Sequence, residues 1–460
     1  MNTQIVACDD RNQNWLIKGA SVITMDPALG ELATADILVR EGVIVDVAPV
    51  IDCPDVPVID ARDFIAIPGF VDTHRHLWEG LIRNTLPDGT LGDYFHVANG
   101  AFGPIYTPDD VYAGTLLSAL GALDAGVTTV LDWAHVQNSP DHTEASLAAL
   151  HEAGGRAVFA FGPPTNESIG HRYPEDILRL RRDHFASDDQ LLTLALAAVS
   201  PEHIAPEVAK RNWSKAREAG VRISTHAGIA GKGSPDEIER FGRAGLLGPD
   251  VTLIHCATLS ETEWKIVADT GTTISISTPI ELLMGHGMPP LQQALDAGIE
   301  PSLSVDVETS MPGDFFTQMR ATLTLQRGLS FAREHAGEAA PERMTVRDVL
   351  RYATVAGAHT NGLSGRVGRI ARGLQADIVL LRADTINTMP VNDLVGAVVL
   401  GMDLSNVDTV MVAGRIVKRD GRLLGVNMEK LRTTVYEARD RIFGKTGMRC
   451  FCKQHAGGFV

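Results

Sequence analysis

Eight short apolar segments alternate with helix-like segments across residues 68–365, and this alternation constrains the fold more than any other feature. Strands that alternate with helices form βα units around a parallel sheet. Eight such units in succession predict an α/β fold, the (β/α)8 or TIM barrel. The eight segments are 70–76, 127–135, 156–162, 191–200, 221–228, 251–258, 272–279 and 299–308.

The two ends of the chain differ from this middle part. Residues 14–66 contain short β-branched runs separated by glycine, aspartate and proline, a pattern typical of strands joined by turns. The same pattern occurs after residue 366. Residues 426–445 have helical periodicity with interspersed charges, so we expect a helix on the surface or at a subunit contact. Cys450 and Cys452 could form a metal or redox pair, although a single Cys-x-Cys is weak evidence.

Composition excludes several classes of partner. The 460 residues include 41 basic and 57 acidic side chains, a net charge of −16, which argues against nucleic acid or an anionic membrane as a partner. No segment reaches about 18 consecutive apolar residues, so we expect no transmembrane helix. The first residues lack the pattern of a signal peptide, and five scattered cysteines fit a reducing compartment. We therefore expect a cytoplasmic protein.

Ionisable residues gather at the ends of the apolar segments, where a barrel collects its functional groups. Side chains two apart on a strand face the same way, so His74 and His76 should both point into the barrel mouth while Arg75 points away. The residues at such ends are His74, His76, His135, His226, His255 and Asp306.

This set of histidines and one aspartate predicts a metal site. A single buried histidine is more often a core residue than a ligand, but several imidazoles and a carboxylate buried together are costly unless a cation satisfies them. Neutral imidazoles and a carboxylate suit one divalent transition metal, Zn²⁺ in the first place, with Fe²⁺, Co²⁺ or Mn²⁺ as alternatives. Such a metal makes hydroxide available near neutral pH. Asp306 could be both ligand and base, and His255 could polarise the substrate.

Three motifs resemble the amidohydrolase superfamily, and the resemblance extends over nearly the whole chain. They are PGFVDTHRH at 68–76, ADIVLL at 376–381 and VDTVMVAGRIVKRDG at 407–421. The resemblance implies a small β-sandwich built from both chain ends, residues 1–67 and 366–425. The barrel would then occupy 68–365, and a C-terminal helix and tail 426–460.

The resemblance also implies roles for individual residues. The family's metal ligands match His74, His76, His226 and Asp306, and its histidine on the sixth barrel strand matches His255. Dinuclear members carry a lysine on the fourth strand; the segment 191–200 has none, which implies one metal ion. The layout is similar to the mononuclear branch of chlorotriazine hydrolases and S-adenosylhomocysteine and guanine deaminases. The local sequence pattern is also similar to that of phenylurea and molinate hydrolases.

Two positions depart from the deaminases of this branch. Ile229 stands where they have a proton-shuttling glutamate, and Glu281 stands where they have an asparagine. Glu281 could transfer a proton, contact a substrate N–H, or be a solvated loop acid. With Ile229 unable to carry a proton, we expect cleavage of a carbonyl–N or carbonyl–S bond in an amide, urea, carbamate or thiocarbamate. The alternative is an aminohydrolase or dechlorinase acting on a nitrogen heterocycle such as a purine, pyrimidine or triazine.

The expected pocket is apolar and aromatic, which suits a small apolar organic substrate. No cluster of lysine or arginine occurs at the strand ends, which disfavours phosphates and dicarboxylates. Relatives in this branch also imply a homo-oligomer, a dimer or larger. A non-catalytic scaffold is the remaining hypothesis, and the retained ligand residues argue against it. The expected wall residues are Trp78, Tyr94, Trp133, His135, Phe161 and His286.

Overall fold

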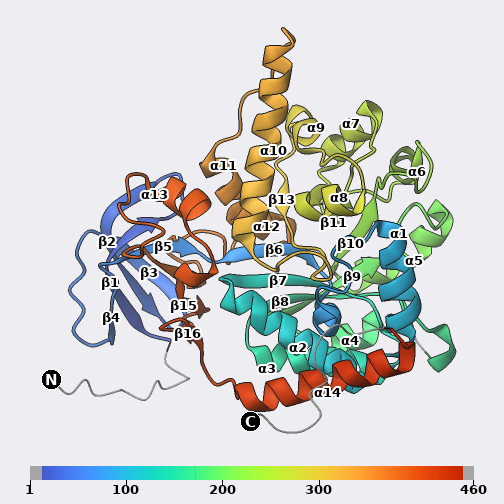
Figure 1. Cartoon of the computed structure of the whole chain (residues 1–460), viewed down its shortest axis with the longest axis horizontal. Helices are drawn as coiled ribbons and strands as arrows, with labels where there is room; N and C mark the ends of the chain where they lie inside the picture. Colours follow the sequence, from blue (N-terminus) through green and yellow to red (C-terminus); the bar gives the residue numbers. More distant parts are fainter. Residues whose placement is uncertain (1–12, 171, 449–460) are drawn as a thin grey trace.

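A computed structural model of the protein describes residues 13–448 except residue 171, so Cys450 and Cys452 lie outside the described residues. It contains a parallel barrel and a second, mainly antiparallel sheet beside it (Figure 1). The barrel strands run in the order β13-β12-β11-β10-β9-β8-β7-β6. They are β6 Phe70–Arg75, β7 Val127–Ala134, β8 Arg156–Phe161, β9 Leu192–Ala198, β10 Arg222–Ala227, β11 Val251–His255, β12 Thr273–Ile276 and β13 Ser302–Leu303.

Each predicted apolar segment contains one of these strands, so the predicted (β/α)8 barrel is confirmed. The last strand is the shortest, but the chain beyond it continues beside β6. There Asp306 donates its backbone N–H to the carbonyl of His74 at 2.9 Å, and Asp306 pairs with Arg75 in a parallel bridge. This pairing closes the barrel and brings Asp306 next to His74 of β6 and to His76, which directly follows this strand.

Helices between the strands cover the outside of the barrel. Their ends follow local sequence signals: Ser260 and Glu263 form a capping box at the start of α7, and Gly271, with φ 69°, ends it in the left-handed conformation. The barrel helices are α1 Leu91–Tyr94, α2 Pro108–Asp124, α3 Pro140–Ala153, α4 Ile177–Asp183, α5 Pro206–Glu218, α6 Glu237–Arg243, α7 Glu261–Thr270, α8 Thr278–Met284, α9 Leu291–Asp296, α10 Phe315–His335, α11 Val346–Arg351 and α12 Gly357–Thr360.

Strands from the two chain ends meet in one nine-stranded sheet, as the family resemblance implied for the two chain ends. Its order is β17-β16-β15-β14-β5-β1-β2-β3, with β4 paired to β1. The strands enclose an apolar core of their own that includes Ile37, Ile378 and Met411. The strands are β1 Trp15–Ile23, β2 Glu31–Arg40, β3 Val43–Ala48, β4 Val58–Asp60, β5 Phe64–Pro68, β14 Ile378–Arg382, β15 Val407–Val412, β16 Arg415–Arg419 and β17 Arg422–Leu423.

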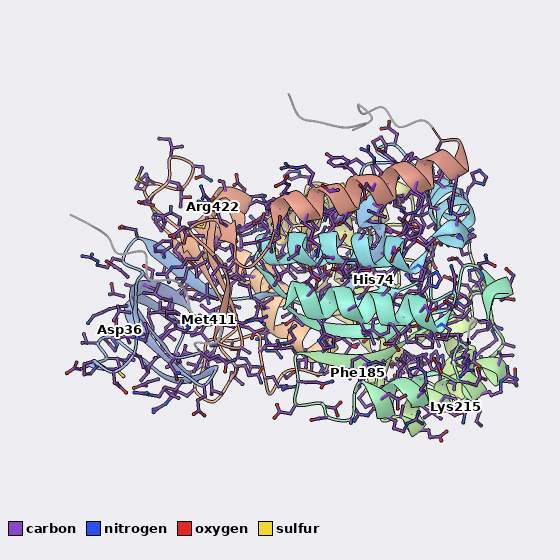
Figure 2. The ribbon with its side chains drawn as sticks, turned by 90° about the horizontal axis from the view of Figure 1, so that it is seen from below. Asp36, His74, Phe185, Lys215, Met411 and Arg422 are labelled. Atoms are coloured by element: carbon purple, nitrogen blue, oxygen red, sulfur yellow. The ribbon has the colours of Figure 1, made fainter. Side chains whose placement is uncertain are left out.

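The sheet and the barrel are held together by a shared core and a buried ion pair. Ile67 of β5 and Val379 of β14 belong to the same apolar cluster as Phe315 of α10. Arg156 of β8 pairs with Asp377 at 2.9 Å, and both side chains are buried. Figure 2 labels His74 in the barrel part and Asp36 and Met411 in the sheet part.

The predicted C-terminal helix is α14, Met428–Thr446. It lies along α2 on the surface of the barrel (Figure 1). Phe443 packs on Phe102 with ring centroids 5.0 Å apart, and Arg441 forms an ion pair with the buried Asp110. Short elements complete the chain: the 3₁₀-helix η1 Leu77–Ile82, the π-helix η2 Phe95–Phe102 and the helix α13 Leu394–Gly396.

Candidate metal centre and active site

His74 of β6 and His76, which directly follows this strand, point into the mouth of the barrel, as the alternation along a strand predicts. His74 Nε2 lies 3.0 Å from Asp306 Oδ1 and 3.2 Å from His226 Nε2. His76 Nδ1 lies 2.8 Å from the carbonyl oxygen of Trp133, which can accept a hydrogen bond from the Nδ1–H of this ring. In that tautomer Nε2 is unprotonated and can bind a metal ion; it lies 3.5 Å from Asp306 Oδ1. Arg75 turns the other way and pairs with Asp72 at 2.7 Å.

Four residues form a group that could hold a metal ion. His74, His226, His255 and Asp306 each offer one ligand atom, and these atoms lie within 4.8 Å of one another. This group includes His255, which we expected to act on the substrate rather than on the metal, and omits the predicted ligand His76. His76 nevertheless adjoins the group through Asp306, so the division of roles between His76 and His255 stays a prediction.

The protonation of these side chains fits a divalent metal. Burial, reinforced by the neighbouring charge of His74, lowers the pKa of His76 to about 3. Burial likewise holds the pKa of His226 well below its usual range. Burial opposes ionisation of Asp306, but the hydrogen bond and charge of His74 outweigh it and lower the pKa of this carboxyl. His76 and His226 are therefore neutral imidazoles beside a carboxylate, and such donors are those expected for Zn²⁺ and neighbouring transition metals.

Two residues of this group have a strained backbone conformation. His255 and Asp306 are non-glycine residues with φ of 75° and 67°. Each conformation of this kind costs on the order of 1–3 kcal/mol and persists only where the surroundings impose it. In both residues the strain turns a side chain toward the candidate metal centre from the end of its strand.

Glu281 lies behind His255 and outside the pocket lining. It is fully buried in α8, and its Oε1 lies 3.1 Å from His255 Nδ1 and 2.9 Å from the backbone N–H of Ser277. Of the three alternatives for Glu281, the solvated loop acid is therefore wrong, direct contact with a substrate does not fit its position, and proton transfer stays a prediction. Burial opposes charging of His255, but the hydrogen bond to Glu281 and the charges of Asp306 and Glu281 outweigh it and raise the pKa of His255.

A cavity of about 320 Å³ opens above the candidate metal centre. His76, His226, His255 and Asp306 line its floor. Tyr94, Trp133, His135 and His286 lie in its lining, as predicted, together with Phe95, Ile229 and Met284.

Two predicted wall residues lie elsewhere. Trp78 is buried behind His135, to whose Nδ1 its indole N–H donates at 3.4 Å, because the chain turns into η1 directly after His76. Phe161 is the last residue of β8, and its ring packs on Tyr173 rather than into the cavity. The neighbouring wall is formed instead by Pro163 and Pro164.

One acidic residue in the lining escaped the sequence analysis. Glu202 follows β9 and accepts a hydrogen bond from the backbone N–H of Ile229 at 2.9 Å and from Ser200 Oγ at 3.2 Å. The signal was present, because Glu202 comes just after the fourth apolar segment, at the barrel end where the other site residues were sought.

These features place the chain in a class of parallel barrels whose strand ends bring histidines and an aspartate together. The sequence model of the Amidohydrolase family matches residues 65–417, so the chain belongs to this family. It is a hydrolase that acts on carbon–nitrogen bonds other than peptide bonds.

Curated relatives align with almost the whole chain. A 5-methylthioadenosine/S-adenosylhomocysteine deaminase of Acetivibrio thermocellus is 27% identical over 451 residues, covering 93% of this chain and 99% of the relative. A 5'-deoxyadenosine deaminase of Methanosarcina barkeri is 25% identical over 438 residues, covering 93% and 98%.

Solved structures share the fold. An adenosine deaminase from Xanthomonas campestris with bound zinc has a TM-score of 0.82 at 22% identity, covering 94% of this chain and 99% of that one. An atrazine chlorohydrolase from Arthrobacter aurescens complexed with zinc has a TM-score of 0.81 at 24% identity, covering 92% and 100%. Among the described helices, none combines the length and apolar character needed to cross a bilayer.

Proposed function

We propose that the protein is a metal-dependent aminohydrolase that removes an amino group from a ring carbon of a nitrogen heterocycle. Water adds to the ring carbon, the carbon–nitrogen bond breaks, and the products are a ring carbonyl and ammonia. The observation that carries the proposal is that Asp306 and His255 line one cavity, with His255 Nε2 3.8 Å from Asp306 Oδ2. A base and a polarising group thus face the same substrate.

The relatives support the heterocycle over the acyclic amide or urea that we first favoured from the sequence. Their names are those of deaminases acting on adenosine derivatives. The aromatic and apolar walls of the cavity suit a flat heterocyclic ring as well as they suit a phenylurea.

The candidate ligands fit Zn²⁺, and a bound divalent metal would lower the pKa of a water molecule and supply the nucleophile near pH 7. Asp306, held as a carboxylate, accepts a proton from the attacking water. His255, oriented by Glu281 through Nδ1, presents Nε2 to the cavity and stabilises negative charge that develops on the substrate. The apolar walls exclude bulk water and so strengthen these interactions.

A second candidate function is hydrolysis of an amide, urea or carbamate. It is favoured by Ile229, because an apolar side chain lines the cavity where a deaminase of this branch would hold a carboxyl group. A carbonyl substrate with a good leaving group depends less on protonation of the nitrogen that leaves.

One screen separates the two functions. The zinc-loaded protein is incubated with aminopurines, aminopyrimidines, aminotriazines, phenylureas, carbamates and amides, and ammonia and amine products are measured. We expect ammonia from heterocycles, and a chelator should abolish its release. Turnover of ureas or carbamates with no ammonia from any heterocycle would refute the aminohydrolase and support the second candidate.

A further inference from the structure

Glu202 is held rigidly at the edge of the cavity. It lies in the loop between β9 and α5, while its Oε1 is bound to the backbone N–H of Ile229 beyond β10 and its Oε2 to Ser200 Oγ. Each carboxylate oxygen has two acceptor sites, so each of these bonds leaves one site open. The carboxylate is therefore fixed in position with capacity for further donors.

Glu202 is one of two carboxylates among the described residues that line the cavity, and these residues include no lysine or arginine. The other carboxylate, Asp306, is engaged with His74 in the candidate metal centre. The nearby cation Lys232 is exposed and lies over the ring of Phe95, 5.1 Å from its centroid. Glu202 thus gives its part of the cavity lining a negative charge that no lysine or arginine of the described lining balances.

We propose, on the basis of the aminohydrolase function above, that Glu202 selects the substituent carried by the heterocycle. Its carboxylate accepts a hydrogen bond from an ammonium or N–H group of the substrate and repels a carboxylate. The hydrogen bonds of Glu202 go to Ile229 and Ser200 rather than to the candidate metal ligands, so its carboxylate is not taken up by the metal centre. The substrates are then neutral or cationic heterocycles.

Recognition by a fixed carboxylate gives a specific energetic signature. Charge-assisted hydrogen bonds are the strong ones, and a like charge left facing a carboxylate is penalised, so one group both favours a cation and rejects an anion. If Glu202 only stabilised the two loops, its replacement would change the affinity for all substrates by the same factor. The substitution Glu202→Gln separates these cases, because the amide oxygen can still accept from Ile229 while the charge is lost.

The test uses three adenosine analogues that differ at the 5' position: 5'-amino-5'-deoxyadenosine, a cation; 5'-deoxyadenosine, which is neutral; and adenosine-5'-carboxylate, an anion. Binding of the matching hypoxanthine nucleosides, the products of the proposed reaction, is measured by calorimetry on the zinc-loaded protein. Ammonia release from the three adenosine analogues is measured separately.

We expect the wild type to bind the cationic ligand more tightly than the anionic one. Glu202→Gln should reduce this ratio of dissociation constants by about tenfold to a hundredfold, the range for a hydrogen bond to a charged group. Lys232→Met, which removes the exposed cation outside the lining, should leave the ratio as in the wild type.

Three results would overturn the assignment of Glu202: an unchanged ratio in Glu202→Gln, a wild type that binds no member of the series, or a wild type that prefers the anion. A change of ratio in Lys232→Met but not in Glu202→Gln would likewise assign selection to Lys232. Charge-dependent binding without ammonia release would refute the proposed reaction and leave the role of Glu202 standing.

Discussion

The hydrogen bond between Glu281 and His255 provides a quantitative test of the site. Glu281→Gln can keep its amide oxygen at the Oε1 position, 2.9 Å from Ser277 N and 3.1 Å from His255 Nδ1, but it loses the negative charge. A neutral hydrogen bond contributes ~1 kcal/mol and a charged one ~1.5–3 kcal/mol, so the loss is ~0.5–2 kcal/mol. At ~1.4 kcal/mol per tenfold in rate, kcat should fall about twofold to thirtyfold.

Glu281→Ala removes the whole hydrogen bond, and kcat should fall about tenfold to 150-fold. Because Glu281 does not line the cavity, KM should stay near the wild-type value in both variants. The loss of its charge should also move the pH–rate limb of His255 to lower pH, since that charge helps to raise the pKa of His255.

Steady-state kinetics on the best substrate from the screen, with metal content measured in parallel, gives the result. Glu263→Gln is the matched control, because Glu263 is a buried glutamate that binds backbone N–H groups of Ile238 and Ser260, away from the cavity. It should lower stability without this effect on kcat. A wild-type kcat in Glu281→Ala, or a raised KM with unchanged kcat, would refute the positioning role.

Three further predictions address the metal, the fold and pH. His76→Ala should lower the metal bound per chain and abolish hydrolysis, as read by elemental analysis and activity; full metal content with full activity would contradict its assignment as a ligand. Arg156→Ala should leave Asp377 buried without its partner and cost about 3–5 kcal/mol of stability, measured by urea unfolding; an unchanged midpoint would mean that the ion pair contributes nothing. Burial raises the pKa of Asp132 to about 7, from about 4 in the unfolded chain, so its contribution to stability is full below pH 4 and is lost as pH rises through 7. Asp132→Asn, whose amide oxygen can still accept from Leu77 N–H, should therefore gain stability relative to the wild type by up to about 1.4 kcal/mol per pH unit over this window; a pH-independent difference would show that Asp132 does not titrate there.

Much of the barrel was predictable because its signals are local. A buried parallel strand needs a run of apolar residues, and the helices begin and end at residues such as Ser260 and Gly271 that are readable one by one. The position of His74 and His76 on one side of the chain at the end of β6 follows from the two-residue period of a strand. The same period explains why Arg75 turns away to pair with Asp72.

The failures have a common origin, the turns that follow the strands. Trp78 was expected in the pocket because it comes two residues after His76, but η1 replaces the strand period there and turns the indole behind His135. A loop was one of the alternatives for Glu281, whereas α8 begins right after β12 and directs its carboxylate toward His255. The hydrophobic periodicity of the sequence does not predict how such a short helix is rotated about its axis.

The sequence by itself determined the class of fold and predicted the barrel end at which the histidines and Asp306 gather, because each depends on periodicity or on the position of a residue relative to its own strand. The tertiary structure alone decided which groups face one another. The hydrogen bond between His255 and Glu281 depends on the packing of α8. The hydrogen bond from the backbone N–H of Ile229 to Glu202 depends on the register between β9, β10 and β11. These distances arise only when segments far apart in the chain pack together.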